Sequence, residues 1–107
     1  MTTFDKRKDA FENKFAHDAE LRFKAEARRN KLLGIWAAGE MGKTGPAADA
    51  YAKEVVASDF VEAGEEDVFR KIRKDFDDAR VAQTDAQIRA RMAEFMATAM
   101  QQVAGEG

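Results

Sequence analysis

AELRFKAEARRNKLLGIWAAGEM, residues 19–41, is the stretch that decides the fold, because it keeps a helical period over a long run without proline. Four apolar residues recur at spacings of four, seven and four, which places them along one side of an α-helix: Leu21, Ala25, Leu32 and Trp36. Ile35 widens this stripe. Five basic residues fall mostly outside it, where their long stems can reach water: Arg22, Lys24, Arg28, Arg29 and Lys31. We therefore predict a helix roughly 35 Å long, with Trp36 as a core anchor, against which the rest of the chain packs.

Three shorter helices are predicted after this one. A helix over residues 46–60 would bury Tyr51, Val55, Val56 and Phe60. A third would begin in the acidic run Glu65, Glu66 and Asp67 and bury Val68, Phe69, Ile72 and Phe76. A fourth would begin at a capping box of Thr84 and Gln87 and bury a wide face: Ile88, Met92, Phe95, Met96, Ala99 and Val103. The predicted fold class is all-α, a four-helix bundle with a long first helix and a flexible amino-terminal segment.

The loop AAGEMGKTGP, residues 37–46, is predicted to end the long helix. Gly42 suits the position just after a helix, and Gly45-Pro46 suits the start of the next one. The run Gly42-Lys43-Thr44 resembles the end of a phosphate-binding loop. That motif also needs a glycine where this chain has Ala37, and it needs a preceding strand. We therefore predict a helix-ending loop at these residues and no phosphate site.

Composition favours a single cytoplasmic domain. The chain has 107 residues, 36% of them charged and 45% hydrophobic, and it has no cysteine. Residues 1–43 carry a net charge of +3 and residues 44–107 one of −5, an asymmetry too mild for a nucleic-acid-binding face. The sequence has no long apolar run and no signal-peptide-like start. We expect no nucleic-acid partner and no direct insertion into a membrane.

Catalytic chemistry is not evident in this sequence. His17 is the single histidine, so neither a zinc site nor a nucleophilic triad can be built in the usual way. The acidic pairs Glu65/Glu66 and Asp77/Asp78 lack the apolar setting that raises the pKa of a catalytic acid. The basic side of the third helix could be a docking patch, but we interpret it as a face exposed to solvent. Met92, Met96 and Met100 could form an adaptable binding surface, but we interpret them as residues that fill the core. We predict a protein that is not an enzyme and needs no metal.

The first eighteen residues carry equal numbers of acidic and basic residues, and their apolar content is almost wholly Phe4, Phe11 and Phe15. On an ideal helical wheel these positions fall within roughly 40° of one another and about 70° from the stripe of the long helix. Two interpretations follow. The phenylalanines either fold back onto the bundle through a bend, or they form a separate apolar face for another protein. In the second case the segment can be loose alone and become helical on binding.

Three blocks of this sequence resemble one small bacterial family. They are FAHDAELRFKAEARRNKLLGIWAA at residues 15–38, AYAKEVVASDF at residues 50–60 and EEDVFRKIRKDF at residues 65–76. In this order they are similar to the zeta-type inhibitor subunit of the alphaproteobacterial ATP synthase, and the resemblance covers nearly the whole chain. It implies a regulatory protein, monomeric when free and cytoplasmic, that associates with the inner membrane through the synthase.

The resemblance also implies where inhibition resides. An amino-terminal segment, residues 1–16, would insert between the catalytic α and β subunits beside γ and block ATP hydrolysis, while residues 17–104 form the bundle. The corresponding partner-binding residues of this chain are Phe4, Arg7, Lys8, Phe11, Glu12, Lys14 and Phe15. Two alternatives are left open, a small nucleotide-sensing bundle with weak ATP or ADP binding and a general protein-interaction module.

Overall fold

Four helices make up the described part of the chain, which in this computed structural model is the backbone of residues 3–59 and 65–106 and the side chains of residues 19–59 and 65–106. They are α1 (Thr3–Glu40), α2 (Pro46–Ser58), α3 (Glu66–Ala79) and α4 (Asp85–Glu106). The predicted all-α bundle with a long first helix is confirmed. At 38 residues, α1 is about 57 Å long at the usual helical rise. It accounts for most of the 64 Å length of a molecule only 24 and 22 Å across.

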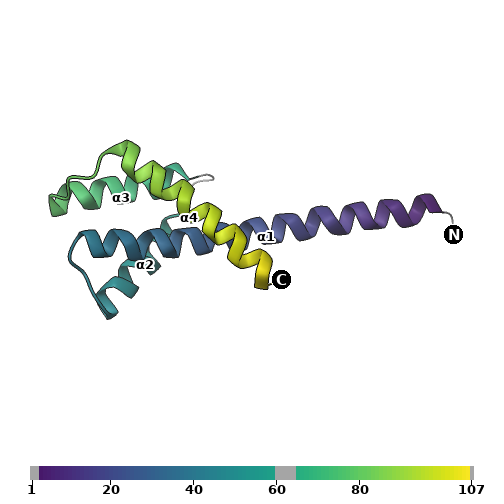
Figure 1. The fold of residues 1–107 in the computed structure, drawn as a ribbon, viewed down its shortest axis with the longest axis horizontal. Helices are drawn as coiled ribbons and strands as arrows, with labels where there is room; N and C mark the ends of the chain where they lie inside the picture. Colours follow the sequence, from purple (N-terminus) through teal and green to yellow (C-terminus); the bar gives the residue numbers. More distant parts are fainter. Residues whose placement is uncertain (1–2, 60–64, 107) are drawn as a thin grey trace.

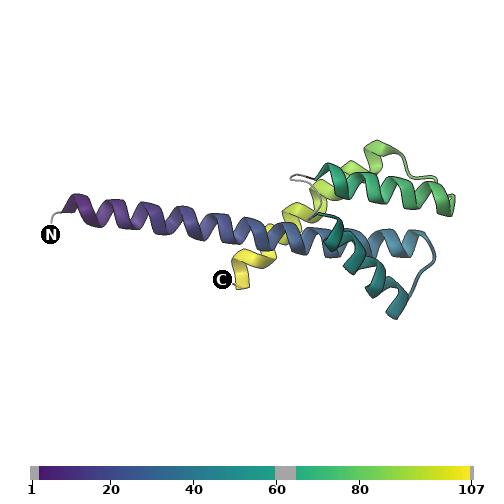
Figure 2. The ribbon, with the colours of Figure 1, turned by 180° about the vertical axis from the view of Figure 1, so that it is seen from behind.

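The helix α1 is the element that holds the others together. It contacts α2, α3 and α4, and its contacts with α2 and α4 are the most extensive. Figure 1 shows α2 and α3 gathered around the carboxyl-terminal part of α1, with α4 crossing it obliquely. From the opposite side, Figure 2 shows the amino-terminal part of α1 projecting beyond the other three helices. The long helix is therefore a shared wall at one end and a single projecting helix at the other.

The end of α1 follows the predicted pattern. Gly42 has a φ of 79°, the left-handed conformation that glycine tolerates best. Its amide donates to the carbonyl of Gly39 at 3.1 Å, and the amide of Lys43 donates to the carbonyl of Ala38 at 2.8 Å. This pair of bonds is the Schellman motif, which satisfies carbonyls that a helix end leaves without partners. The predicted helix stop at Gly42 is confirmed.

The start of α4 is also as predicted. The backbone amide of Thr84 donates to Oε1 of Gln87 at 2.8 Å, and the amide of Gln87 donates to Oγ1 of Thr84 at 3.1 Å. These reciprocal bonds form the capping box, which satisfies two amide donors at the helix start. Two residue types three positions apart were enough to predict this boundary.

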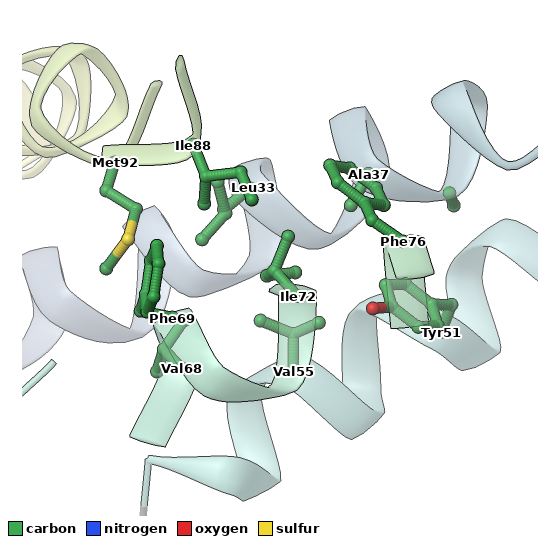
Figure 3. Packing of buried hydrophobic residues seen from close by; sticks show 11 residues of the cluster. Leu33, Ala37, Tyr51, Val55, Val68, Phe69, Ile72, Phe76, Ile88 and Met92 are labelled. Carbon is green, nitrogen blue, oxygen red and sulfur yellow. The ribbon is translucent and has the colours of Figure 1, made fainter. Parts of the chain in front are cut away.

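The main core draws side chains from all four helices, as Figure 3 shows. Its buried members are Leu33, Ala37, Ala38, Tyr51, Val55, Val68, Phe69, Ile72, Phe76, Ile88 and Met92. A second, smaller cluster joins α1 to the end of α4 through Ala25, Ala99 and Val103, with Leu21 and Met96 packed against it. The predicted stripes of α3 and α4 are largely confirmed, although Phe95 and Met96 are only partly buried. Phe60 lies outside the described residues.

The predicted stripe of α1 is partly wrong. Ala25 is fully buried, but Leu21 and Leu32 are half-buried, and Ile35 is 42% exposed. Trp36 is also half-buried: it packs at the edge of the core, with its ring centroid 5.5 Å from that of Phe76. The fully buried positions of the last turns are Leu33, Ala37 and Ala38. The reason is that α2 and α4 cover different sides of α1, which widens and rotates its buried face.

The crossing of α1 and α2 depends on Gly34. A Cβ atom at this position would lie 2.7 Å from the Cα of Ala52 and 3.2 Å from its Cβ. We expect Gly34→Ala to destabilise the bundle, because a backbone contact this short forces the two helices apart. Gly39 is in the same helix and has open space around it, so Gly39→Ala should stabilise the protein by about 0.5–1 kcal/mol through helix propensity. Melting temperatures that move in opposite directions would confirm the assignment, and two equal increases would contradict it.

Candidate functional site

The amino-terminal part of α1 carries the predicted partner-binding residues. All seven lie within the helical backbone that begins at Thr3: Phe4, Arg7, Lys8, Phe11, Glu12, Lys14 and Phe15. Their side chains are outside the described part of the structure, so their roles stay predictions. Among the described side chains of α1, Leu21 is the earliest that packs in a core cluster. The backbone between Thr3 and Leu21 spans about 27 Å of helix.

The base of this projecting helix is held by short-range ion pairs. Lys24 lies 3.3 Å from Glu20, and Nε of Arg22 lies 3.3 Å from Oε1 of Glu26. Both pairs join residues four apart on the helix surface, and each stabilises a helix by about 0.2–0.5 kcal/mol. Phe23, on the same turns, is 61% exposed. These local pairs support helical structure where α1 leaves the bundle.

Arg28 fastens the last turn of α4 to α1. One guanidinium nitrogen lies 2.7 Å from Oε1 of Glu106 and donates to Gln102 at 3.0 Å, and the other donates to Oε2 of Glu106 at 3.0 Å. The hydrogen bond from Arg28 is the main reason why the pKa of the Glu106 carboxyl is lowered. Beside this pair the smaller core cluster packs Ala25 against Ala99 and Val103. The end of α4 therefore marks the point from which α1 extends alone.

A buried polar network connects α1 to the end of α2 and the start of α3. Arg29 and Asn30 are 4% and 1% exposed. Nε of Arg29 donates to Oδ1 of Asn30 at 3.0 Å, and its NH1 donates to Oε2 of Glu65 at 3.2 Å. The Asn30 amide nitrogen donates to Oδ2 of Asp59 at 3.1 Å. The expectation that Arg29 extends into water is therefore wrong, because its charge is satisfied inside the protein.

The buried face of α1 also corrects the wheel argument about the amino-terminal aromatic positions. A series at spacings of four is buried, consisting of Ala25, Arg29, Leu33 and Ala37. On an ideal wheel the mean direction of this series agrees with that of positions 4, 11 and 15 to within about 10°. The offset of about 70° resulted from choosing the wrong stripe. The direction of the aromatic positions is therefore the same whether the phenylalanines fold back onto the bundle or face another protein. The feature that bears on this choice is the length of α1 beyond the bundle.

The loop at Gly42-Lys43-Thr44 has no phosphate-binding geometry. It follows a helix, and the backbone amides of Gly42 and Lys43 already donate to Gly39 and Ala38. A phosphate-binding loop needs such amides to point at the ligand. The interpretation as a helix-ending loop is supported by these bonds.

We expect Lys43→Ala to change any affinity for ATP by less than about twofold, because this lysine would not hold a phosphate. Isothermal titration of the purified protein with ATP and ADP tests the prediction, with Gly39→Ala as a control for helix-end effects. A loss of about a hundredfold would restore the phosphate-loop interpretation.

Three of the four basic residues of α3 form ion pairs, and the fourth, Lys74, is exposed. Lys71 lies 3.1 Å from Asp75, and Arg73 lies 2.7 Å from Asp77 and 3.0 Å from Asp85. These pairs support a solvated face and not a basic docking patch.

The acidic pairs do not have the setting of a catalytic acid. Glu66 is bound by Arg89 at 3.0 and 3.2 Å, and this hydrogen bonding lowers the pKa of its carboxyl, the opposite of what a catalytic acid needs.

The three methionines of α4 differ in environment. Met92 is 3% exposed and belongs to the main core, whereas Met100 is 47% exposed. The core interpretation is right for Met92 and wrong for Met100.

In the described ranges, 3–59 and 65–106, no helix is both long and apolar enough to cross a membrane.

Comparison with known proteins agrees with the sequence resemblance. Residues 1–102 match the family model described as ATPase inhibitor subunit zeta. A protein structure solved in solution by NMR is 49% identical to this chain, covers 81% of it and 99% of its own length, and superimposes with a TM-score of 0.71. No curated protein matches this chain. Since the family match covers nearly all of its residues, the chain belongs to the family of ATPase inhibitor subunit zeta.

Proposed function

We propose that this protein blocks ATP hydrolysis by the F-type ATP synthase by inserting residues 1–16 as a helix at a catalytic α/β interface, beside the γ subunit. Family membership supports the coarser role of an ATP synthase inhibitor. In the proposed mechanism residues 17–104 are the bundle that holds the protein on the catalytic sector. The protein would be cytoplasmic, peripheral to the inner membrane through the synthase, and regulatory in its action.

The observation that carries this proposal is the projection of α1. The helix continues from the bundle toward Thr3 for about 27 Å beyond Leu21, and none of the other described helices lies beside its end in either view (Figures 1 and 2). A single helix of this length can enter a cleft between two subunits without unfolding the bundle. Binding through a helix laid into a groove is a common recognition mode, and its energy comes from a few apolar anchors on one face.

The proposed anchors are Phe4, Phe11 and Phe15, which share one side of the helix at these positions in the sequence. Four charged residues would flank them and fix the orientation of the helix: Arg7, Lys8, Glu12 and Lys14. Charges at the rim of an interface contribute mainly to specificity and association rate, whereas buried aromatic side chains contribute most of the affinity. The segment has both kinds of residue at helical spacing.

Inhibition of the purified catalytic sector by full-length variants tests the proposal. Phe11→Ala should raise the concentration needed for half-inhibition by about tenfold, because one buried aromatic anchor is worth at least about 1.4 kcal/mol. Phe11→Leu is the matched control and should retain most of the inhibition, since it keeps an apolar side chain of similar size. Equal inhibition by wild type and Phe11→Ala would remove Phe11 from the interface.

No specific observation favours the alternative of a nucleotide sensor. The loop at Gly42-Lys43-Thr44 is closed by its own backbone hydrogen bonds, and the family match supports an inhibitor.

A further inference from the structure

The seam between α1 and α2 contains an open groove outside the projecting segment. Its main hollow has a volume of about 550 Å³ and is lined by Lys31, Asp49, Ala52, Lys53, Val56 and Ala57. A smaller hollow shares Val56 and continues toward Phe23 and Ala27 of α1. We call the two together the α1/α2 groove.

The shape of the α1/α2 groove follows from small side chains. Gly34 lets α1 and α2 approach closely at Ala52. Away from this crossing, Ala27 and Ala57 line the seam and leave its floor apolar and open. At its outer end lies Phe23, the most exposed large apolar residue among the described side chains, at 61%. The groove therefore offers a small apolar floor and one exposed aromatic ring that the apolar side of a helix can cover.

The rim of the main hollow carries two lysines that are free to pair with a partner. Lys31 and Lys53 are both exposed and form no ion pair with any described residue. Lys43 and Lys74 are exposed and unpaired in the same way, but they lie outside the groove. The acids at the narrow end are occupied, since Glu26 pairs with Arg22 and Asp59 accepts from Asn30. Among the described residues that line the main hollow, Asp49 is the one acid against Lys31 and Lys53, so their net charge is positive.

We propose that the α1/α2 groove docks an acidic amphipathic helix of an α or β subunit of the catalytic sector. Its apolar side chains would occupy the floor at Val56 and Ala57, and its carboxylates would pair with Lys31 and Lys53. This inference rests on the proposed function and adds a second contact to it. Phe23 connects the groove with the proposed inhibitory segment, because it lies on the same helix, eight residues after Phe15. A subunit that encloses residues 1–16 has its neighbouring surface at the base of the same helix.

The test measures inhibition of the purified catalytic sector by full-length charge-reversal variants at low salt. Lys31→Glu combined with Lys53→Glu should raise the half-inhibitory concentration by about 10–100-fold, because two attractive pairs become repulsive. Inhibition at saturation should stay complete, since residues 1–16 are intact. The matched control combines Lys43→Glu with Lys74→Glu, which makes the same charge change at two exposed lysines outside the groove, and it should stay within about twofold of wild type.

Salt and a milder variant sharpen this test. The difference between the groove variant and wild type should narrow at about 0.5 M salt, because exposed ion pairs are screened. Lys31→Gln combined with Lys53→Gln should show a smaller effect in the same direction without adding like charges. Equal half-inhibitory concentrations for wild type and both groove variants would overturn the inference, and so would an equal loss in the control. Failure of the proposed function is distinguishable, because wild type would then not inhibit at any concentration.

Crosslinking identifies the occupant. With benzoylphenylalanine in place of Ala57, irradiation of the complex should attach the protein to an α or β subunit, whereas the same probe in place of Lys74 should not. Sedimentation of the free protein should give a monomer. A wild-type dimer that the groove variant dissociates would assign the groove to a second copy of this chain and overturn the proposal.

Discussion

Removal of residues 1–14 is expected to abolish inhibition of ATP hydrolysis and to leave the bundle folded. The deleted part contains Phe4 and Phe11, and the remaining Phe15 would sit at a frayed helix end. Two or three aromatic anchors at roughly 1–3 kcal/mol each correspond to a loss of about a hundredfold or more in affinity. The core clusters begin at Leu21, so the described packing does not depend on the deleted residues. The measurement is a titration of the purified catalytic sector, with a melting curve for each protein.

A length-matched variant separates loss of the anchors from loss of the helix. Phe4→Ala, Phe11→Ala and Phe15→Ala combined in one full-length chain should inhibit as poorly as the truncated protein. Its melting temperature should stay within a few degrees of wild type. If the truncated protein inhibits as well as the full chain, the amino terminus does not act on the enzyme. If truncation melts the bundle, these phenylalanines belong to the core and fold back onto it.

The boundaries of the bundle could be predicted because local chemistry determines them. A glycine at the end of α1 and a capping box at the start of α4 are recognisable from residue types a few positions apart. The apolar stripe of α3 was also predictable, because this short helix packs on one side only and shows a simple period. The end of α3 carries a weaker local signal. Arg80 takes the left-handed conformation there with a φ of 59°, and the sequence offers no glycine as a signal.

The packing of α1 could not be predicted, because it depends on where the other helices lie. A helix covered on two sides buries residues that a single stripe leaves out, such as Leu33 and Ala37. Burial of Arg29 depends on Glu65, 36 positions away, and no local pattern reports that distance. Asn30 was the available signal, since asparagine is unfavourable inside a helix unless its side chain has a partner. Here the partners are Arg29 and Asp59.

Of the two candidate binding surfaces, one was identified from the sequence and the other was not. The amino-terminal segment was identified from the sequence resemblance, and its backbone is helical from Thr3 onward. The α1/α2 groove was not foreseen, because Phe23, Lys31 and Lys53 become neighbours of one seam only when α2 folds back along α1. The sequence shows these residues as ordinary members of two helices.

Phe76→Ala should be the most destabilising single substitution considered for this bundle, at about 3–5 kcal/mol. The ring is fully buried and lies edge-on to Trp36, with a centroid distance of 5.5 Å and an interplanar angle of 68°. Truncation removes its contacts with the core and leaves a cavity where α1 and α3 meet. Each kcal/mol lowers the melting temperature of a domain of this size by about 4–8 °C, so we expect a decrease of at least 12 °C or so.

Two further variants serve as a comparison and a control for Phe76→Ala. Trp36→Ala should cost less than Phe76→Ala, because Trp36 is only half-buried at the edge of the core. Ile35→Ala is the surface control: at 42% exposure it should change the free energy of unfolding by less than about 1 kcal/mol. Chemical denaturation of the three proteins measures these differences directly. Equal stability of Phe76→Ala and Ile35→Ala would contradict the placement of Phe76 in the core. At a temperature where Phe76→Ala is still folded, its inhibition at saturation should match wild type, because residues 1–16 and the α1/α2 groove are both unchanged.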